Sequence, residues 1–480
     1  MLLRQFAIAA LLVAGLSAAL LFNEFQAYSS DAGQHYALVR ALMDLDKWGS
    51  PAATPNLGNL PFYPPMSHWL AAEVGKVFGS GLRGMTLVAS ASVGLFYLAM
   101  FIFSLRINWR APIIACLITI CYALLRGPVF GRQVVNNYFY AQVVGSTLAV
   151  LTLLIAFNQS HKWKGFIVDL FVLIMGQIIV ATHLLPAEQL IGAYCMVLLV
   201  HAWTTSSWRI FGRLIVFSLL SMTLTALSPF ASNVYAIAQL EGGAHINHLL
   251  GNRFVQIVFL ILGSVASIKL ILQTREKADA GMFLGCMGLS SCCLAFLQIA
   301  LFWVGIGSNY AIAKHMFVTV AFFIFVVSAN IALKNSSPSD FERFGVTKGL
   351  AWCSILALLT MRVDLYPSVL DLKKVVAFQT AVRTLSTHLE NEDGRRPVAL
   401  AKQWPPNISY GISIGDLRFP MSVADLILED RPLPQDQVSI AFMPPDDPGV
   451  IPECSVPAHS NQDAEAFDYS CVVRSANTRR

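Results

Sequence analysis

The stretch YSSDAGQHY at residues 28–36 follows shortly after the first apolar run of the chain, residues 5–22. Further along, NLPFYPPMSHWL at residues 59–70 opens a second amphipathic stretch. An acidic residue, Asp31, therefore stands where the chain leaves its first apolar run. Because ionisable groups at a membrane are costly unless they have a role, Asp31 marks a candidate site.

The composition identifies the class of protein. Of the 480 residues, 56% are hydrophobic and only 13% are charged, and the mean hydropathy is +0.60. Soluble globular domains carry about 25% charged residues, so the chain is expected to be an integral membrane protein with several spans. Most basic residues lie in short loops between apolar runs, where they report orientation, and nucleic acid is therefore not expected as a partner.

Apolar windows long enough for a helix to cross a bilayer predict an α-helical polytopic fold with about eleven transmembrane helices. The uninterrupted apolar run at the start of the chain favours a retained anchor over a cleaved signal peptide. The windows lie at 5–22, 84–105, 111–126, 139–157, 165–183, 187–203, 212–228, 254–273, 281–305, 315–333 and 348–362.

Lysine and arginine are distributed unevenly between the connecting loops. The positive-inside rule places the basic set in the cytoplasm. The alternate loops, which include residues 23–83, and the tail after residue 362 are then expected outside the cytoplasm. The basic set consists of Arg4, Arg106, Arg110, Lys162, Lys164, Arg209, Arg213, Arg275, Lys277, Lys334, Arg343 and Lys348.

The first outer loop is expected to contain two helices that lie along the membrane surface. A helix from Asp31 to Leu45 and a second helix from Pro65 to Phe78 would each carry one apolar face. In the simplest interpretation, Asp31 is an acid in a first turn that interacts favourably with the helix dipole. The expected apolar faces are Tyr36, Val39 and Met43 in the first helix and Leu70, Val74 and Phe78 in the second.

The tail, residues 363–480, is rich in Pro, Asp, Glu and Asn, and it predicts a small α+β extracytoplasmic domain after a transmembrane domain of residues 1–362. Cys454 and Cys471 lie in this tail, where an oxidising compartment would allow them to form a disulfide. The predicted elements are a helix at 375–389, strands at 398–401 and 438–442, and a turn at 404–407.

The order and spacing of these segments resemble the GT-C class of membrane glycosyltransferases, which includes protein O-mannosyltransferases, bacterial aminoarabinose transferases and oligosaccharyltransferases. In that class the first span is followed by an outer loop of two juxtamembrane helices, with an acid near its start and an aromatic-Pro-Pro segment in its second half. Here DAGQHYA at residues 31–37 matches the acidic segment, and residues 59–70 match the second segment. The similarity covers residues 1–105, and beyond them it rests on topology.

The resemblance implies an inverting enzyme that transfers a sugar from a polyprenyl-phosphate carrier to a lipid, glycan or protein acceptor on the extracytoplasmic face. Such a reaction needs a base for the acceptor and cations for the departing phosphate. Asp31 matches the base, and Lys314 is a candidate for the phosphate, although a lysine at a span end also snorkels toward the headgroups. The other candidate substrate-binding residues are His35, Tyr63, Arg132, His183, Glu188, Arg253 and His315.

The sequence departs from the GT-C pattern at one point. Many enzymes of that class have a second acid beside the first or in the next outer loop, and this chain has none between Arg126 and Tyr140. Three explanations are open. Glu188 or Glu241 substitutes for the second acid, a single Asp is sufficient for catalysis, or the protein has the fold without the activity. A divalent metal cofactor is therefore one option rather than an expectation.

Two other functions are consistent with the sequence. One is a transporter or flippase for a lipid-linked substrate, although the chain lacks the repeat between halves that many transporters have. The other is a non-catalytic partner of an envelope polysaccharide assembly machine, and the absence of a second acid favours this alternative. For all three functions the expected location is the inner membrane of a bacterium, with the site facing the periplasm or the cell exterior.

Overall fold

The protein divides into two compact units. The helical unit comprises residues 1–21, 89–134 and 139–365, and the mixed unit comprises residues 22–88, 135–138 and 366–480. The mixed unit thus joins the tail to the segment predicted to be the first outer loop, which keeps that name below, although most of the chain separates them in sequence. A computed structural model describes residues 12–17, 30–45, 48–58, 60–124, 129–137, 139–160, 164–230, 251–275, 279–334, 372–386, 396–401, 406–428, 433–434, 438–445, 459–460 and 462–469.

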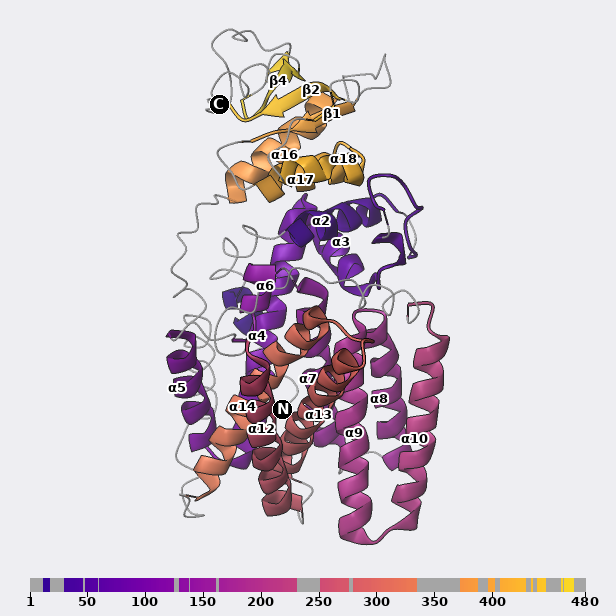
Figure 1. The fold of residues 1–480 in the computed structure, drawn as a ribbon, viewed down its shortest axis with the longest axis vertical. Coiled ribbons are helices and arrows are strands. Elements are labelled where there is room, and N and C mark those ends of the chain that lie inside the picture. Colours follow the sequence, from indigo (N-terminus) through magenta and orange to yellow (C-terminus); the bar gives the residue numbers. More distant parts are fainter. Residues whose placement is uncertain are drawn as a thin grey trace. The chain divides into compact units, whose positions relative to one another are not determined.

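Long apolar helices make up most of the described part of the helical unit (Figure 1). Seven described helices are long and apolar enough to cross a membrane. These are α4 (Gly81–Ile107), which begins in the mixed unit, α7 (Tyr140–Gln159), α9 (Leu184–Thr205), α10 (Trp208–Leu227), α12 (Arg253–Thr274), α13 (Ala280–Trp303) and α14 (Asn309–Lys334). Two shorter apolar helices are α5 (Arg110–Leu124) and α8 (Gly165–Val180), and α6 (Arg132–Asn137) is a short helix before α7.

Each predicted window between residues 84 and 333 coincides with one of these apolar helices. The windows at 111–126 and 165–183 form helices of only 15 and 16 residues. The last window, 348–362, lies outside the described residues, as does the first except for residues 12–17, which are helical. The polytopic helical fold is confirmed, while the count of eleven spans stays a prediction.

Hydrogen bonds between neighbouring helices hold buried polar groups in the helical unit. The Thr147 hydroxyl of α7 donates to the Ser92 carbonyl of α4 at 2.8 Å. The Ser291 and Thr319 hydroxyls, on α13 and α14, are 2.7 Å apart. Such groups need partners inside the protein because a bilayer core offers none.

The first outer loop forms the expected pair of helices, α2 (Ser30–Met43) and α3 (Met66–Phe78), with a short 3-10 helix, η1 (Leu60–Phe62), before α3. Tyr36 and Val39 of α2 are fully buried, whereas Leu70 and Phe78 of α3 are 48% and 52% exposed. The apolar face of α3 is therefore exposed, as a helix at a membrane surface requires. The residues that α3 buries are small, polar or aromatic: Ser67, His68, Trp69, Ala71, Ala72 and Gly75.

The tail forms a four-stranded sheet with three described helices, α16 (Leu372–Ser386), α17 (Pro406–Gly415) and α18 (Met421–Leu428) (Figure 1). The strand order is β1-β2-β4-β3. The parallel pairing of β1 and β2 requires a crossover, which contains α17 and α18. The strands are β1 (Arg396–Ala399), β2 (Val438–Met443), β3 (His459–Ser460) and β4 (Glu465–Asp468), and β4 pairs antiparallel with both β2 and β3.

The predicted helix at 375–389 and both predicted strands correspond to α16, β1 and β2. The turn expected at 404–407 is wrong in its second half, because α17 begins at Pro406. A proline at the first helical position loses no intrahelical hydrogen bond, so a Pro-Pro pair can precede a helix as well as a turn. The sequence did not predict α17, α18, β3 or β4.

The tail and the first outer loop share one hydrophobic core. Ala37 of α2 and Leu57 pack with apolar residues of the tail, among them Phe419. The Asn56 side-chain amide donates to the Ile414 carbonyl at 3.0 Å. Because burial of apolar surface is the main favourable term in folding, these distant segments fold as one body.

Candidate functional site

Asp31 lies in the first turn of α2, in the mixed unit, and its side chain is half-buried. Tyr63 directly follows η1 and lies near this carboxylate. Burial, and then the negative charge of Asp31, raise the pKa of Tyr63, so the phenol is neutral over the whole physiological range. The site therefore has one carboxylate beside a phenol that can donate a hydrogen bond.

His35, one turn after Asp31 on α2, forms a buried pair with His68 of α3. The His35 Nδ1 and His68 Nε2 atoms are 2.7 Å apart, and the two rings are stacked with centroids 4.9 Å apart. The Tyr63 ring is nearly perpendicular to both imidazoles, with its centroid 5.5 Å from each of theirs. Asp31, His35, Tyr63 and His68 thus form one cluster, the Asp31 cluster.

The hydrogen bonds of the pair decide the tautomers. Burial lowers the pKa of His68 to about 3, so this ring is neutral and carries one proton. His68 bonds the Pro64 carbonyl, which can only accept, and its Nε2 then accepts from His35 Nδ1. In a neutral His35 the lone pair is then on Nε2. The cluster holds a second group, besides Asp31, that can accept a proton.

Sequence reasoning identified Asp31, His35 and Tyr63 but missed His68. His68 lies on α3, thirty-three residues after His35, and it is fully buried. Helical periodicity links residues three or four apart and says nothing about a contact between two helices. The one available signal was a histidine on the small and polar side of an otherwise apolar helix.

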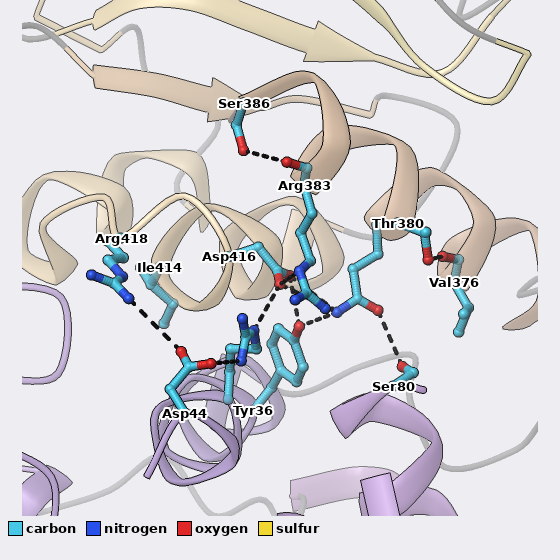
Figure 2. Close-up of polar contacts among 12 residues, drawn as sticks. Tyr36, Asp44, Ser80, Val376, Thr380, Arg383, Ser386, Ile414, Asp416 and Arg418 are labelled. Carbon is cyan, nitrogen blue, oxygen red and sulfur yellow. Dashed lines mark hydrogen bonds and ion pairs between the residues drawn. The ribbon is translucent and has the colours of Figure 1, made fainter. Parts of the chain in front are cut away.

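A second polar cluster holds α2 further along its length, around the fully buried side chain of Asp416 at the end of α17 (Figure 2). The Tyr36 hydroxyl donates to Asp416 Oδ2 at 2.6 Å, and Gln379 Nε2 donates to the same oxygen at 3.1 Å. Arg40 Nε and Arg383 Nε lie 3.5 and 3.7 Å from Asp416 Oδ1. These five residues, the Asp416 cluster, come from α2, α16 and the end of α17.

The free energy of unfolding of the mixed unit is expected to fall as the pH rises from about 4 to about 6. Burial raises the pKa of Asp416 from 3.8 to about 6, although its bond from Tyr36 and the charges of Arg383 and Arg40 act in the opposite direction. In this window the folded chain keeps a proton that the unfolded chain has released, so stability present at low pH is lost. The shift corresponds to at most about 3 kcal/mol.

Melting temperatures in detergent at pH 4.5 and pH 7, for the wild type and for Asp416→Asn, measure this effect. The amide does not titrate, so the difference between the two proteins isolates Asp416 from the other carboxylates. We expect a smaller loss of stability between the two pH values in Asp416→Asn. An equal loss in both proteins would contradict the prediction.

In the helical unit, Lys314 lies in the second turn of α14. Its ammonium group is 4.8 Å from the ring centroid of Phe139 and 4.1 Å from that of Tyr310. Gln142 Nε2 donates to the Lys314 carbonyl at 2.7 Å, which ties α7 to the start of α14. The aromatic rings attract the ammonium group electrostatically.

His183 and His315 lie close to Lys314. His183 is the N-cap of α9, and its Nδ1 accepts from the Leu185 N–H at 3.3 Å, which leaves Nε2 as the donor. Lys314 and His315 both lie near enough to act electrostatically on the buried His183 ring. Among the described residues, neither ring nitrogen of the fully buried His315 has a hydrogen-bond partner. Lys314, His183 and His315 form a second candidate site, the Lys314 group.

Three predicted site residues of the helical unit lie outside the Lys314 group. Arg253, the first residue of α12, donates to Gln256 Oε1 at 2.6 Å and to Asn309 Oδ1 of α14, and its guanidinium lies 4.8 Å from the Phe302 ring centroid. It thereby connects the ends of three helices. Arg132 is buried at the start of α6, and Glu188 is half-buried in the second turn of α9.

The described residues do not fit a metal centre, because no group of three or more His, Cys, Asp or Glu side chains among them could hold an ion. In the Asp31 cluster the two imidazoles bond each other. Glu241, Cys454 and Cys471 lie outside the described residues. The predicted disulfide therefore stays a prediction.

No protein-family model and no curated protein sequence matches the chain. Among solved structures, the chain is similar to ArnT from Cupriavidus metallidurans bound to undecaprenyl phosphate, with 13% identity, a TM-score of 0.51 and 98% of each chain covered. The apo state of that protein gives a TM-score of 0.49, also at 13% identity over 98% of both chains. The oligosaccharyltransferase of Archaeoglobus fulgidus gives 0.42, at 13% identity over 91% of this chain and 69% of that chain.

At 13% identity, the first of these matches shows a shared fold over nearly the whole chain. The fold that the GT-C resemblance implied is therefore confirmed. Together with the seven apolar helices, it identifies a multi-pass integral membrane protein.

Proposed function

We propose that this chain, which has the fold of ArnT, is an inverting glycosyltransferase with a polyprenyl-phosphate-linked sugar as its donor. The observation that carries the proposal is the match over 98% of both chains to a protein that holds undecaprenyl phosphate. Since one fold can host many functions, the proposal also needs suitable side chains. The Asp31 cluster and the Lys314 group supply a proton acceptor and a cation.

In the proposed reaction an acceptor hydroxyl or amine attacks the anomeric carbon of the sugar, and the bond from this carbon to the carrier phosphate breaks. Asp31 takes the proton of the acceptor, as a general base does. The electron pair of the broken bond stays on the phosphate, whose negative charge grows in the transition state. Lys314 and the Nε2–H of His183 are proposed to stabilise that charge.

The remaining predicted residues are assigned by their neighbours. We assign His35 and Tyr63 to the acceptor, because they lie in the Asp31 cluster. His315 is assigned to the donor, because it belongs to the Lys314 group. Donor-binding roles are also proposed for the three residues outside that group, Arg132, Glu188 and Arg253.

The inner membrane of a bacterium is the proposed location, with the site facing the periplasm or the cell exterior. The Lys and Arg asymmetry supports this orientation. The shared core of residues 22–88 and 366–480 agrees with the placement of both segments on one side, because segments that fold as one body must lie on the same side of a membrane. A lipid, glycan or protein is the proposed acceptor.

Undecaprenyl phosphate is expected to raise the melting temperature of the purified protein in detergent, and undecaprenol, which lacks the phosphate, is not. A ligand at 100 times its dissociation constant stabilises a protein by about 2.7 kcal/mol. Proteoliposomes supplied with a panel of undecaprenyl-phosphate-linked sugars and labelled acceptors then test transfer directly. Movement of the lipid across the vesicle membrane without transfer would favour the transporter, and neither binding nor transfer would favour the assembly partner.

A further inference from the structure

Helix α2, which carries Asp31, and helix α17 of the tail cross with their backbones almost in contact. A Cβ atom built on Gly33 would lie 2.6 Å from a ring carbon of Tyr410 and 3.1 Å from the Cα of Gly411. A Cβ atom built on Gly415 would lie 2.6 Å from a ring carbon of Tyr36. Only glycine fits such approaches without a shift of the neighbouring atoms, so α17 holds the part of α2 that begins two residues after Asp31.

The Asp416 cluster holds the next turn of the same helix. Tyr36 is fully buried, and Figure 2 shows its hydroxyl directed at Asp416, with Arg383 approaching the same carboxylate from α16. Gln379 also bonds the Tyr36 hydroxyl, so one phenol connects α2 with both α16 and α17. Ala37, the next residue of α2, packs into the hydrophobic core of the tail. Polar and apolar contacts therefore hold α2 in one orientation.

We infer that Tyr36 and Asp416 are positioning residues, through which the tail sets the position of α2 and thereby of Asp31. The inference rests on the proposed function of Asp31. A general base must lie within hydrogen-bonding distance of the proton that it takes, and a misplacement of 1 Å can cost about a hundredfold in rate. The tail then contributes to transfer by positioning the base, rather than only covering the core.

Three variants test the inference: Tyr36→Phe, Asp416→Ala and the double variant. Each single variant is expected to increase hydrogen exchange of the amides at residues 30–43 and to lower kcat for transfer at least about tenfold. The KM for the lipid donor should stay within about twofold, because the phosphate-binding residues are not on α2. The double variant should lose little more than the larger single loss, since both changes remove the hydrogen bond between Tyr36 and Asp416.

Tyr469→Phe is the matched control, because Tyr469 is another buried tyrosine of the mixed unit whose hydroxyl accepts a hydrogen bond, from the Leu433 N–H at 2.8 Å. It should lower the melting temperature about as much as Tyr36→Phe does, without increased exchange in α2 and without a loss in kcat. An equal loss of kcat in this control would overturn the inference. So would unchanged exchange in Tyr36→Phe, or losses that simply add in the double variant.

The exchange measurement separates this inference from the proposed function. If the wild type transfers no sugar, the proposed function and the role in positioning a base both fall. Increased hydrogen exchange in α2 of Tyr36→Phe, but not in α2 of Tyr469→Phe, would still support the conclusion that contacts with the tail fix the position of α2. If the wild type is active and Tyr36→Phe keeps its full kcat, the positioning role alone falls.

Discussion

Asp31→Asn is expected to lower the rate of sugar transfer by about two to four orders of magnitude, the range for a positioned acid–base group. Asparagine preserves the size of the side chain and can still accept a hydrogen bond in the first turn of α2, so the protein should accumulate at the wild-type level. Its amide cannot take the proton of the acceptor. The loss should therefore fall on kcat, with little change in the KM for the lipid donor.

Glu73→Gln is the matched control for this variant. Glu73 is an exposed acid of α3 in the same unit, paired with Lys76 at 2.9 Å, and it lies outside the Asp31 cluster. We expect wild-type transfer in Glu73→Gln, measured with the same lipid-linked donor. Wild-type transfer in Asp31→Asn would show that the catalytic assignment is wrong, and would direct attention to His35 as the proton acceptor.

Lys314→Ala is expected to impair both donor binding and the chemical step. Removal of a group that stabilises the charge of a transition state costs about a hundredfold to a thousandfold in kcat. The KM for the donor should rise as well, because the ammonium group would act on the phosphate before the bond to the sugar breaks. The binding of undecaprenyl phosphate, followed by the melting temperature, should weaken in parallel.

Two further variants separate charge from general damage to the helix. Lys334→Ala removes an exposed lysine from the last turn of the same helix, α14, and should leave transfer and binding unchanged. Lys314→Arg keeps the positive charge and should recover part of the lost binding. If Lys314→Ala binds undecaprenyl phosphate as the wild type does, the donor-binding assignment of Lys314 is wrong.

The sequence was informative wherever a pattern is local. Apolar runs predicted the long helices, because a helix in a bilayer needs about twenty consecutive apolar residues whatever its neighbours are. The same local logic predicted α2 and α3, and it identified Asp31 and Lys314 as charged residues at the ends of apolar segments. The fold class and the kind of chemistry to test could therefore be argued from composition, periodicity and the GT-C resemblance.

The tertiary structure alone decided three features: the pairing of His35 with His68, the burial of Asp416, and the core that the first outer loop shares with the tail. Asp416 lies far from α2 in sequence, in a segment for which no helix was expected. From the sequence alone, Gly33 is an ordinary residue that weakens a helix, and only the structure shows Tyr410 and Gly411 beside it. Composition and periodicity record which face of an element avoids water. They do not record which distant element covers that face, because hydrophobic burial is non-directional and many partners would satisfy it equally well.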